Sequence, residues 1–242
     1  MGAFQTAGRS TLYADNGAVA TSHPLASQVA VAMLQDGGNA VDAAIAGAVL
    51  LGACEPHMCG LGGDMFAMVK PAGSEEVVGL NASGHAPAGL DAAALRGRGW
   101  TAIPDSAPEA VVVPGAVAGF GRLSEDYGLK GLDACLAPAI RYFEEGVPVA
   151  PRVAFDWARS AGTPQGVGRA RLVPEGRTPN PGDRYRAPEE AEVLRRIASE
   201  GVGGFYEGEV AEDMVAALRA LGGPHVAEDF AAATADYVAP IA

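Results

Sequence analysis

Four side chains that can ligate a metal lie close together after an apolar stretch of the chain. Cys54, Glu55, His57 and Cys59 offer sulfur, oxygen and nitrogen ligands. A closed zinc site needs a second group of ligands, and a Cys-x4-Cys spacing with no second cluster does not supply one. The other histidines stand alone in the sequence: His23, His85 and His225. We therefore predict no metal site, and expect each histidine to be buried or to line a turn.

A glycine-rich loop, residues 60–63 (GLGG), follows directly. Successive glycine N–H groups can form a nest that binds an anion. This loop lacks the spacing of a dinucleotide fingerprint and the Lys-Ser/Thr pair of a P-loop, and it leads into a predicted strand. The sequence therefore predicts a tight structural turn here, and no cofactor.

Ser83 is the hydroxyl that comes nearest to a nucleophile motif. It lies in residues 81–85 (NASGH), which form only half of the Gly-x-Ser-x-Gly elbow, and Pro87 interrupts any helix that would follow. Cys54 and Cys59 could use His23 or His57 as a base, but no neighbour in the sequence activates either thiol, so inert thiols are expected. The residues alone therefore support neither a serine nor a cysteine nucleophile strongly.

Composition excludes several classes of partner. The 242 residues include 17 Lys and Arg against 29 Asp and Glu, a formal charge of −12. Nucleic acids and anionic membranes are therefore not expected partners, because binding phosphate needs a basic footprint. Residues 1–10 show no apolar signal sequence and residues 43–54 are too short to span a bilayer, so a cytoplasmic protein is expected.

Hydrophobic periodicity predicts an α/β (α+β) fold in a single domain, residues 1–242. Hydrophobic residues make up 49% of the chain and charged residues 19%, which is enough for a packed core. Ser22 is expected to cap the first helix, and Asn39 with Asp42 to form a capping box on the second. Predicted helices cover residues 25–35, 40–53, 116–127, 133–145, 188–200 and 209–221. Predicted strands cover 18–22, 65–70 and 76–81, a turn covers 203–206, and 148–186 are a loop with short helical pieces.

Several blocks of the sequence carry a resemblance. Residues 18–63 strongly resemble the start of the large subunit of the γ-glutamyltransferases (γ-glutamyltranspeptidases). Further blocks resemble the family in the same order: residues 113–119 (VPGAVAG), 137–146 (APAI to EEG), 182–184 (GDR), 205–208 (FYEG) and 228–230 (EDF). Together they cover nearly the whole chain.

This resemblance implies an N-terminal nucleophile hydrolase with an αββα sandwich, incomplete in this chain. Members are made as a precursor that cuts itself, and the new N-terminal threonine of the small subunit becomes the nucleophile. Seven threonines are present, all in contexts unlike that nucleophile: Thr6, Thr11, Thr21, Thr101, Thr163, Thr178 and Thr234. We therefore expect no catalytic residue in this chain, inactivity of the chain alone, and a partner portion that carries the threonine. The segment around Pro240 and Ile241 is expected to be a strand in mid-course, whose exposed edges favour aggregation or a homo-oligomer.

One position departs from the family. Its large subunit grips the α-carboxylate of the γ-glutamyl group with an arginine in an Arg-Glu-x-Ala-Pro context. Aligned on Ala86 and Pro87, that arginine falls at Ser83 and the glutamate at Gly84. Losing a bidentate arginine removes a strong carboxylate contact, for which His85 offers a weaker substitute. Two arginines that could reach in stand outside the motif position: Arg96 and Arg98.

The resemblance leads to one expected function and two alternatives. The first is cleavage of γ-glutamyl amides such as glutathione, with Ser83 and His85 in the substrate-binding site and a small-molecule amide as substrate. The first alternative is cleavage of another acyl amide, such as a cephalosporin side chain or oxamate, which serine at position 83 favours. The second alternative is that the protein is a non-catalytic relic of the family.

Overall fold

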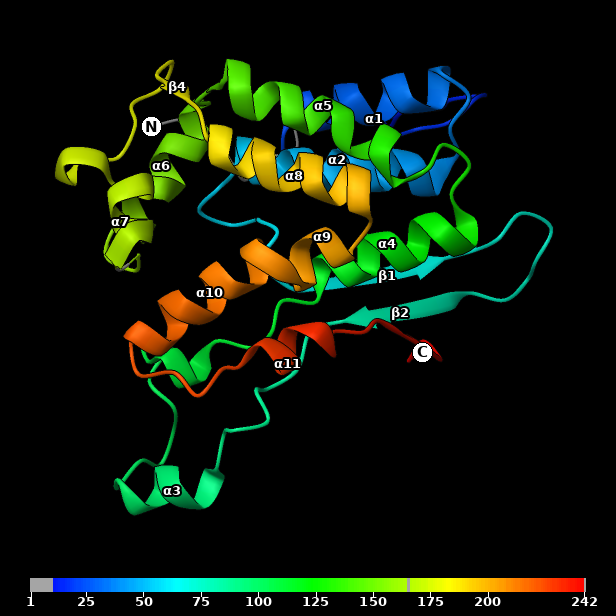
Figure 1. Ribbon diagram of the computed structural model, residues 1–242. Helices are drawn as coiled ribbons and strands as arrows, with labels where there is room; N and C mark the ends of the chain where they lie inside the picture. The colour runs from blue at the N-terminus through cyan, green and yellow to red at the C-terminus, as the bar shows by residue number, and fades with distance from the viewer. Residues whose placement is uncertain (1–10, 165, 242) are drawn as a thin grey trace.

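Helices dominate the computed structural model, which describes residues 11–164 and 166–241 (Figure 1). The sequence-based statements about a signal sequence in residues 1–10 and about Thr6 concern residues outside this range. Helix α2 (Ala40–Cys54) runs through the middle of the helical layer and packs against α1 (Pro24–Gln35), α5 (Leu132–Glu145) and α4 (Ala116–Tyr127). Its Ala, Val, Ile and Leu side chains are buried on nearly every side, as its uniformly apolar sequence predicts. Helix α8 (Pro188–Glu200) extends the layer beside α5.

The start of α2 confirms the predicted capping box. The Asn39 side chain accepts from the N–H groups of Val41 and Asp42, and the Asp42 carboxylate accepts from the Asn39 N–H at 2.8 Å. The cap of α1 differs from the prediction. The Ser22 hydroxyl donates to Glu55 instead, and the His23 ring nitrogen Nδ1 accepts from the Leu25 N–H at 3.2 Å.

Three antiparallel strands form the main sheet in the order β1-β2-β5. They are β1 (Met65–Val69), β2 (Val78–Ala82) and β5 (Asp236–Val238). Two strand predictions are wrong. Residues 18–22 form an extended lead into α1 without a ladder partner, and the last strand ends at Val238, before Pro240, which has no N–H to donate to a ladder.

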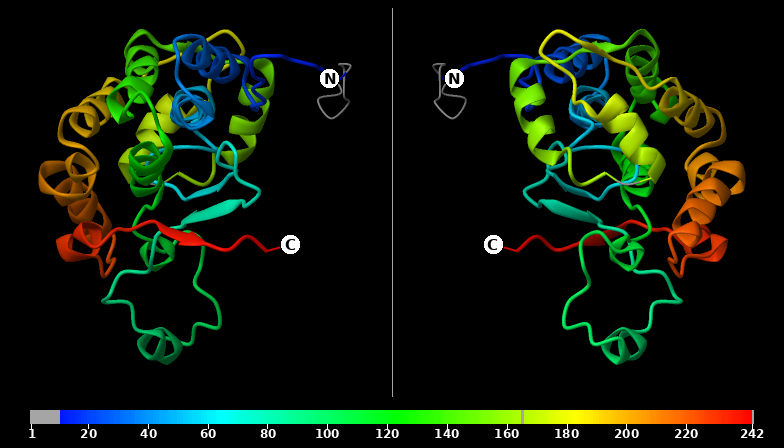
Figure 2. Two further views of the ribbon diagram at one scale, coloured as in Figure 1. Left: turned by 90° about the vertical axis from the view of Figure 1, so that its right-hand side faces the viewer. Right: turned by 90° about the vertical axis from the view of Figure 1, so that its left-hand side faces the viewer.

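The two faces of this sheet have different surroundings. Helix α4 covers the face that carries Ala67, Leu80 and Tyr237, and a Cβ on its Gly119 would lie 2.8 Å from Ala82 Cβ. The opposite face carries Phe66 and Met68, which are 68% and 71% exposed. Figure 2 shows the helices curving around one side of the strands. Among the described residues, helices therefore cover this three-stranded sheet on one face only.

The segment 148–186 contains short helices, as predicted, together with one short strand pairing. It contains α6 (Pro151–Ser160), α7 (Gly166–Leu172), the turn η2 (Pro174–Gly176) and β4 (Arg184–Tyr185), which pairs with β3 (Val147–Pro148). Pro151 fits the first turn of α6, and Val153, Ala154 and Trp157 then meet on one face to form a small core with Val149. The sequence analysis predicted short helical pieces in this segment without giving their bounds, and α6 and α7 are two of them.

Short elements complete the chain. They are α3 (Ala92–Gly97), η1 (Pro108–Ala110), α9 (Gly203–Tyr206), α10 (Gly208–Ala220) and α11 (Ala227–Ala231). The predicted turn at 203–206 is thus a single helical turn. Helix α3 stands at the tip of an extension that projects from the rest of the molecule (Figures 1 and 2).

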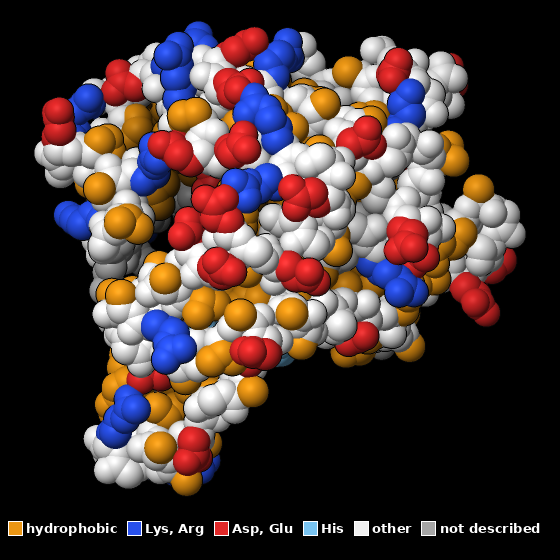
Figure 3. Space-filling model, in the orientation of Figure 1, with side chains coloured by type: hydrophobic (Ala, Val, Ile, Leu, Met, Phe, Trp, Pro, Cys, Tyr) orange, Lys and Arg blue, Asp and Glu red, His pale blue; other side chains and the backbone are white. Residues whose placement is uncertain are grey.

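Charges alternate in sign on the face seen in Figure 3. Over α5 and α8, Arg195 pairs with Glu144, and Arg196 pairs with Glu209 from α10 at 2.5 Å. No continuous basic surface covers this face. Among residues 11–164 and 166–241, no helix is long and apolar enough to cross a membrane.

Candidate substrate-binding loop

Ser83 and His85 lie in a tight loop that begins where β2 ends. The Asn81 side chain accepts a hydrogen bond from the Ser83 N–H at 3.0 Å, an Asx turn that ends the strand. Gly84 then adopts a left-handed conformation with φ +74°. Both Ser83 and His85 are half-buried, so each can meet a small molecule without leaving the fold.

Backbone contact with the segment before α4 fixes the loop. The Val113 N–H donates to the His85 carbonyl at 2.9 Å, forming an isolated bridge. A Cβ on Gly84 would lie 1.9 Å from the Val113 carbonyl oxygen, and one on Gly115 would lie 2.1 Å from that of Ala82. Two chain segments 30 positions apart therefore touch through backbone atoms alone, which only glycine permits at these positions.

Two other segments of the chain contact the N-terminus of α4. The Tyr206 hydroxyl accepts from the Ala118 N–H at 3.0 Å and donates to the Pro114 carbonyl at 2.7 Å. The Ala116 N–H donates to the Gly63 carbonyl at 3.0 Å, so the glycine loop acts as the structural turn that was predicted. Burial raises the pKa of Tyr206 to about 12, which keeps this hydroxyl protonated and able to donate.

Tyr206→Phe is expected to lower the free energy of unfolding by about 2–3 kcal/mol, because it leaves the Ala118 N–H and the Pro114 carbonyl buried without a partner. Urea unfolding of the intact gene product measures this loss. Tyr13→Phe is the matched control, since Tyr13 is 90% exposed, and is expected to leave stability unchanged. Equal effects of the two substitutions would show that the Tyr206 hydroxyl does not hold this junction.

The far end of the loop is held by a buried carboxylate. Asp229, 4% exposed, accepts from the N–H groups of Ala88 and Val226, each at 2.9 Å. His225 is fully buried, and its Nε2 lies 2.8 Å from the Val111 carbonyl oxygen. Three blocks that are distant in the sequence therefore position residues 83–88: 113–115, 205–206 and 225–229. The sequence analysis cited residues 113–119, 205–208 and 228–230 only for resemblance and expected His225 to be buried or to line a turn. It did not identify Tyr206, His225 or Asp229 as supports of the loop.

Arg96 and Arg98 do not take the place of the arginine in the family's motif. Arg98 pairs with Glu109 at 2.6 Å and lies over Trp100, and Arg96 is exposed at the end of α3. Neither arginine occupies the position of Ser83. The loop consequently offers neutral hydrogen-bonding groups and an imidazole at that position, and no guanidinium.

The cysteines and the histidine at and after the end of α2 lie in different environments. Cys54 is buried, and burial raises its pKa to about 12, so the thiol stays protonated at neutral pH. His57 stacks on Trp157 with ring centroids 5.8 Å apart, and burial lowers its pKa. Within the part of the chain that the structure describes, no three His, Cys, Asp or Glu side chains are arranged to hold a metal ion.

Solved structures define the class of this fold. Cephalosporin acylase from Bacillus halodurans superposes with a TM-score of 0.90 at 39% sequence identity, over 98% of this chain and 45% of that one. Helicobacter pylori γ-glutamyltranspeptidase superposes with a TM-score of 0.84 at 28% identity, over 96% of this chain and 68% of that one. The expected α/β fold of the N-terminal nucleophile hydrolases is thereby confirmed.

Sequence comparison identifies the family. The oxamate amidohydrolase proenzyme of Klebsiella pneumoniae is 36% identical over 237 residues, covering 93% of this chain and 44% of that protein. The glutathione hydrolase-like YwrD proenzyme of Bacillus subtilis is 33% identical over 92% of this chain and 43% of that protein. The family described as Gamma-glutamyltranspeptidase matches residues 26–242, and the chain belongs to this family. It spans less than half the length of these two curated relatives.

Proposed function

We propose that this chain is the large-subunit portion of an amidohydrolase whose acyl group is not γ-glutamyl. The observation that carries this proposal is the backbone packing at Gly84, the position where the family's motif has glutamate. A side chain there would begin 1.9 Å from the Val113 carbonyl oxygen. The loop therefore has no room for the glutamate of that pair in its present backbone conformation.

The charges around the loop support the same proposal. A γ-glutamyl group carries an α-carboxylate, which a guanidinium recognises with two parallel hydrogen bonds. Ser83 offers only a hydroxyl, which makes a long 3.4 Å contact with the Gly84 carbonyl. Because Arg98 is paired with Glu109 on the extension that carries α3, it does not replace the missing cation.

Relatives named for other substrates are among the more similar of those compared. The proteins named oxamate amidohydrolase and cephalosporin acylase are 36% and 39% identical to this chain. Relatives named glutathione hydrolase are 28–34% identical. We infer that Ser83 and His85 line the acyl subsite and accommodate a small acyl group without an α-amino acid.

A partner portion completes this proposed enzyme. The exposed sheet face with Phe66, Met68 and Val238 is the surface on which the second sheet of the sandwich would pack. That portion would supply the nucleophilic threonine, whose own α-amine acts as the base. The 242-residue chain alone is then expected to be inactive.

The test compares acyl groups in the intact gene product. It is expected to hydrolyse oxamate or a glutaryl p-nitroanilide at least tenfold more efficiently, in kcat/KM, than γ-glutamyl p-nitroanilide. Ser83→Arg should raise kcat/KM for γ-glutamyl p-nitroanilide about tenfold, the order of one charge-assisted contact. It should lower kcat/KM for the preferred substrate.

Ala94→Arg is the matched control because it adds the same charge on the exposed side of α3. It should leave both activities unchanged. Preference of the unmodified protein for glutathione or γ-glutamyl p-nitroanilide would overturn the acyl assignment. Absence of any amide hydrolysis would instead favour the non-catalytic relic.

A further inference from the structure

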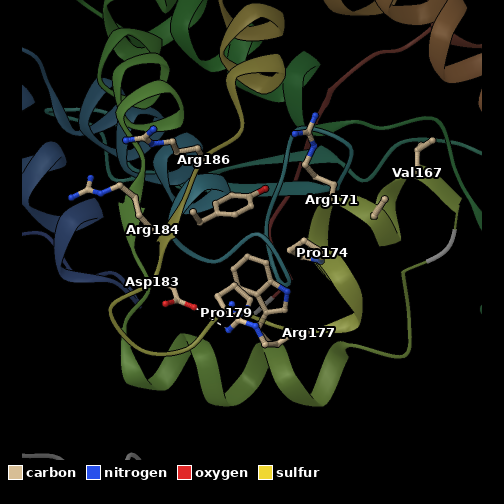
Figure 4. Close-up of a pocket in the computed structure, with 11 residues that line it drawn as sticks. Val167, Arg171, Pro174, Arg177, Pro179, Asp183, Arg184 and Arg186 are labelled. Carbon is tan, nitrogen blue, oxygen red and sulfur yellow. Dashed lines mark hydrogen bonds and ion pairs between the residues drawn. The ribbon is translucent and has the colours of Figure 1, made fainter.

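The pocket beside α6 carries its charged groups in pairs. Figure 4 shows Arg177 paired with Asp183, at 3.2 Å. Arg171 pairs with Glu189 at 2.5 Å, and Arg186 donates to a backbone carbonyl at the end of α5 at 3.1 Å. These arginines are therefore already engaged in holding the surrounding segments together.

The loop after β2 differs, because its polar side chains remain available. The Ser83 hydroxyl makes only a 3.4 Å contact with the carbonyl of the next residue. His85 is half-buried and bonds to the rest of the fold through its backbone carbonyl. Two such groups bind a substrate well only if the backbone that carries them is held in place.

An extension of the chain follows directly on this loop. Residues 89–110 form it and carry α3 at its tip (Figures 1 and 2). The chain leaves the loop at Ala88 and returns at Val111, two residues before Val113, whose N–H donates to the His85 carbonyl. A movement at the base of the extension would therefore displace the loop as well.

One short segment, residues 223–229 between α10 and α11, holds both ends of the extension. Asp229, 4% exposed, accepts from the Ala88 N–H at 2.9 Å where the extension begins. Where it ends, Nε2 of the fully buried His225 lies 2.8 Å from the Val111 carbonyl oxygen. Since a carbonyl can only accept, Nε2 carries the hydrogen and donates.

Close packing accompanies these two hydrogen bonds. A Cβ on Gly89 would lie 3.1 Å from the Pro224 carbonyl oxygen, and one on Gly223 would lie 3.3 Å from Pro108 Cβ. The other ring nitrogen of His225, Nδ1, is buried without a hydrogen-bond partner among the described residues. Replacing this ring therefore removes one defined hydrogen bond at the end of the extension.

We propose that His225 and Asp229 are positioning residues, which clamp the base of the extension and thereby fix Ser83 and His85 in the acyl subsite. This inference rests on the proposed function, in which those two residues bind the acyl group. The clamp residues act through the backbone that they hold. Because the acyl group contacts the loop both before and during the reaction, a displaced loop weakens binding in both states and raises KM, while kcat is retained.

His225→Leu in the intact gene product is expected to raise KM for oxamate about tenfold and to change kcat less than about twofold. His225→Gln keeps an N–H donor for the Val111 carbonyl and should return KM to within about twofold of the unmodified protein. His23→Leu is the matched control, because His23 is a second buried histidine, 4% exposed, whose Nδ1 accepts a hydrogen bond at the start of α1. It should lower the melting temperature without changing KM.

The kinetic outcomes separate the clamp from the proposed function. Equal KM values for the unmodified protein and His225→Leu would overturn the clamp, as would a rise in KM that His225→Gln does not reverse. If the intact gene product prefers γ-glutamyl p-nitroanilide, the acyl assignment fails, and the same KM comparison on that substrate still tests the clamp. If His225→Leu does not fold, Asp229→Asn carries the same prediction from the other end.

Deuterium exchange read by mass spectrometry tests the clamp without any activity. His225→Leu removes the bond at Val111, and we expect it to accelerate exchange at least about tenfold in residues 83–90, at the other end of the extension. His23→Leu should leave this exchange unchanged. Acceleration confined to residues 111–117 would show that the two ends open separately, and would refute the clamp.

Discussion

Replacing Gly84 with alanine is expected to lower the free energy of unfolding by about 2–5 kcal/mol, because two costs add at this position. An L-residue at φ +74° costs roughly 1–2 kcal/mol. A new methyl group 1.9 Å from the Val113 carbonyl oxygen then forces two backbone segments apart, which costs about 1–3 kcal/mol more. Urea unfolding of the intact gene product measures the sum.

Gly73→Ala is the matched control for the first cost alone. Gly73 has φ +76°, and nothing lies within 4 Å of a Cβ built on it. Its replacement should cost only about 1–2 kcal/mol. If the two alanine variants are equally stable, the contact between residues 82–85 and 113–115 does not hold the loop, and the argument against a γ-glutamyl site weakens with it.

Asp42→Asn is expected to destabilise the protein by about 3–5 kcal/mol, because this carboxylate is fully buried among N–H donors. It accepts from the N–H groups of Asn39, Leu129 and Lys130 at 2.8–3.1 Å. A carboxamide replaces one acceptor oxygen with an NH2 group that faces these donors. The substitution therefore weakens both the N-cap of α2 and its contact with the turn between α4 and α5.

Thermal and urea unfolding of the intact gene product both report this loss. Asp133→Asn makes the same chemical change at an exposed position in the first turn of α5 and should cost less than about 1 kcal/mol. A loss at Asp42 no larger than at Asp133 would show that the buried carboxylate is not required to join these elements.

Local sequence signals predicted the helices well. Those with a clear apolar face were found within one or two residues, and the Asn39–Asp42 capping box was recognised because its residue types and spacing are specific. The prediction failed where pairing or packing with distant residues decides the structure. Residues 18–22 have strand-like composition but pair with no strand among the described residues. Short helical pieces were predicted in 148–186, but only packing around Trp157 decides where α6 forms.

The candidate site shows the same division. The resemblance of the sequence to the family placed Ser83 and His85 in the acyl-binding motif. Their role in binding substrate stays a prediction. Tyr206 and Asp229 carried no local signal for supporting this loop, since the Tyr206 contacts join residues 88 and 92 positions apart and one Asp229 contact joins residues 141 positions apart. The presence of a Tyr or Asp in a short motif does not indicate which distant backbone groups its side chain will hydrogen-bond.

The sequence by itself determined the family, the helical periodicity and the absence of an arginine at position 83. These follow from residue types and short spacings, which local physical chemistry relates directly to structure. Only the tertiary structure showed that Gly84 lies against Val113, that Tyr206 bonds to the N-terminus of α4, and that aromatic and basic side chains line an open pocket beside α6. Each of these depends on chain segments far apart in sequence meeting in space, where packing and buried hydrogen bonds, rather than local preference, fix the geometry.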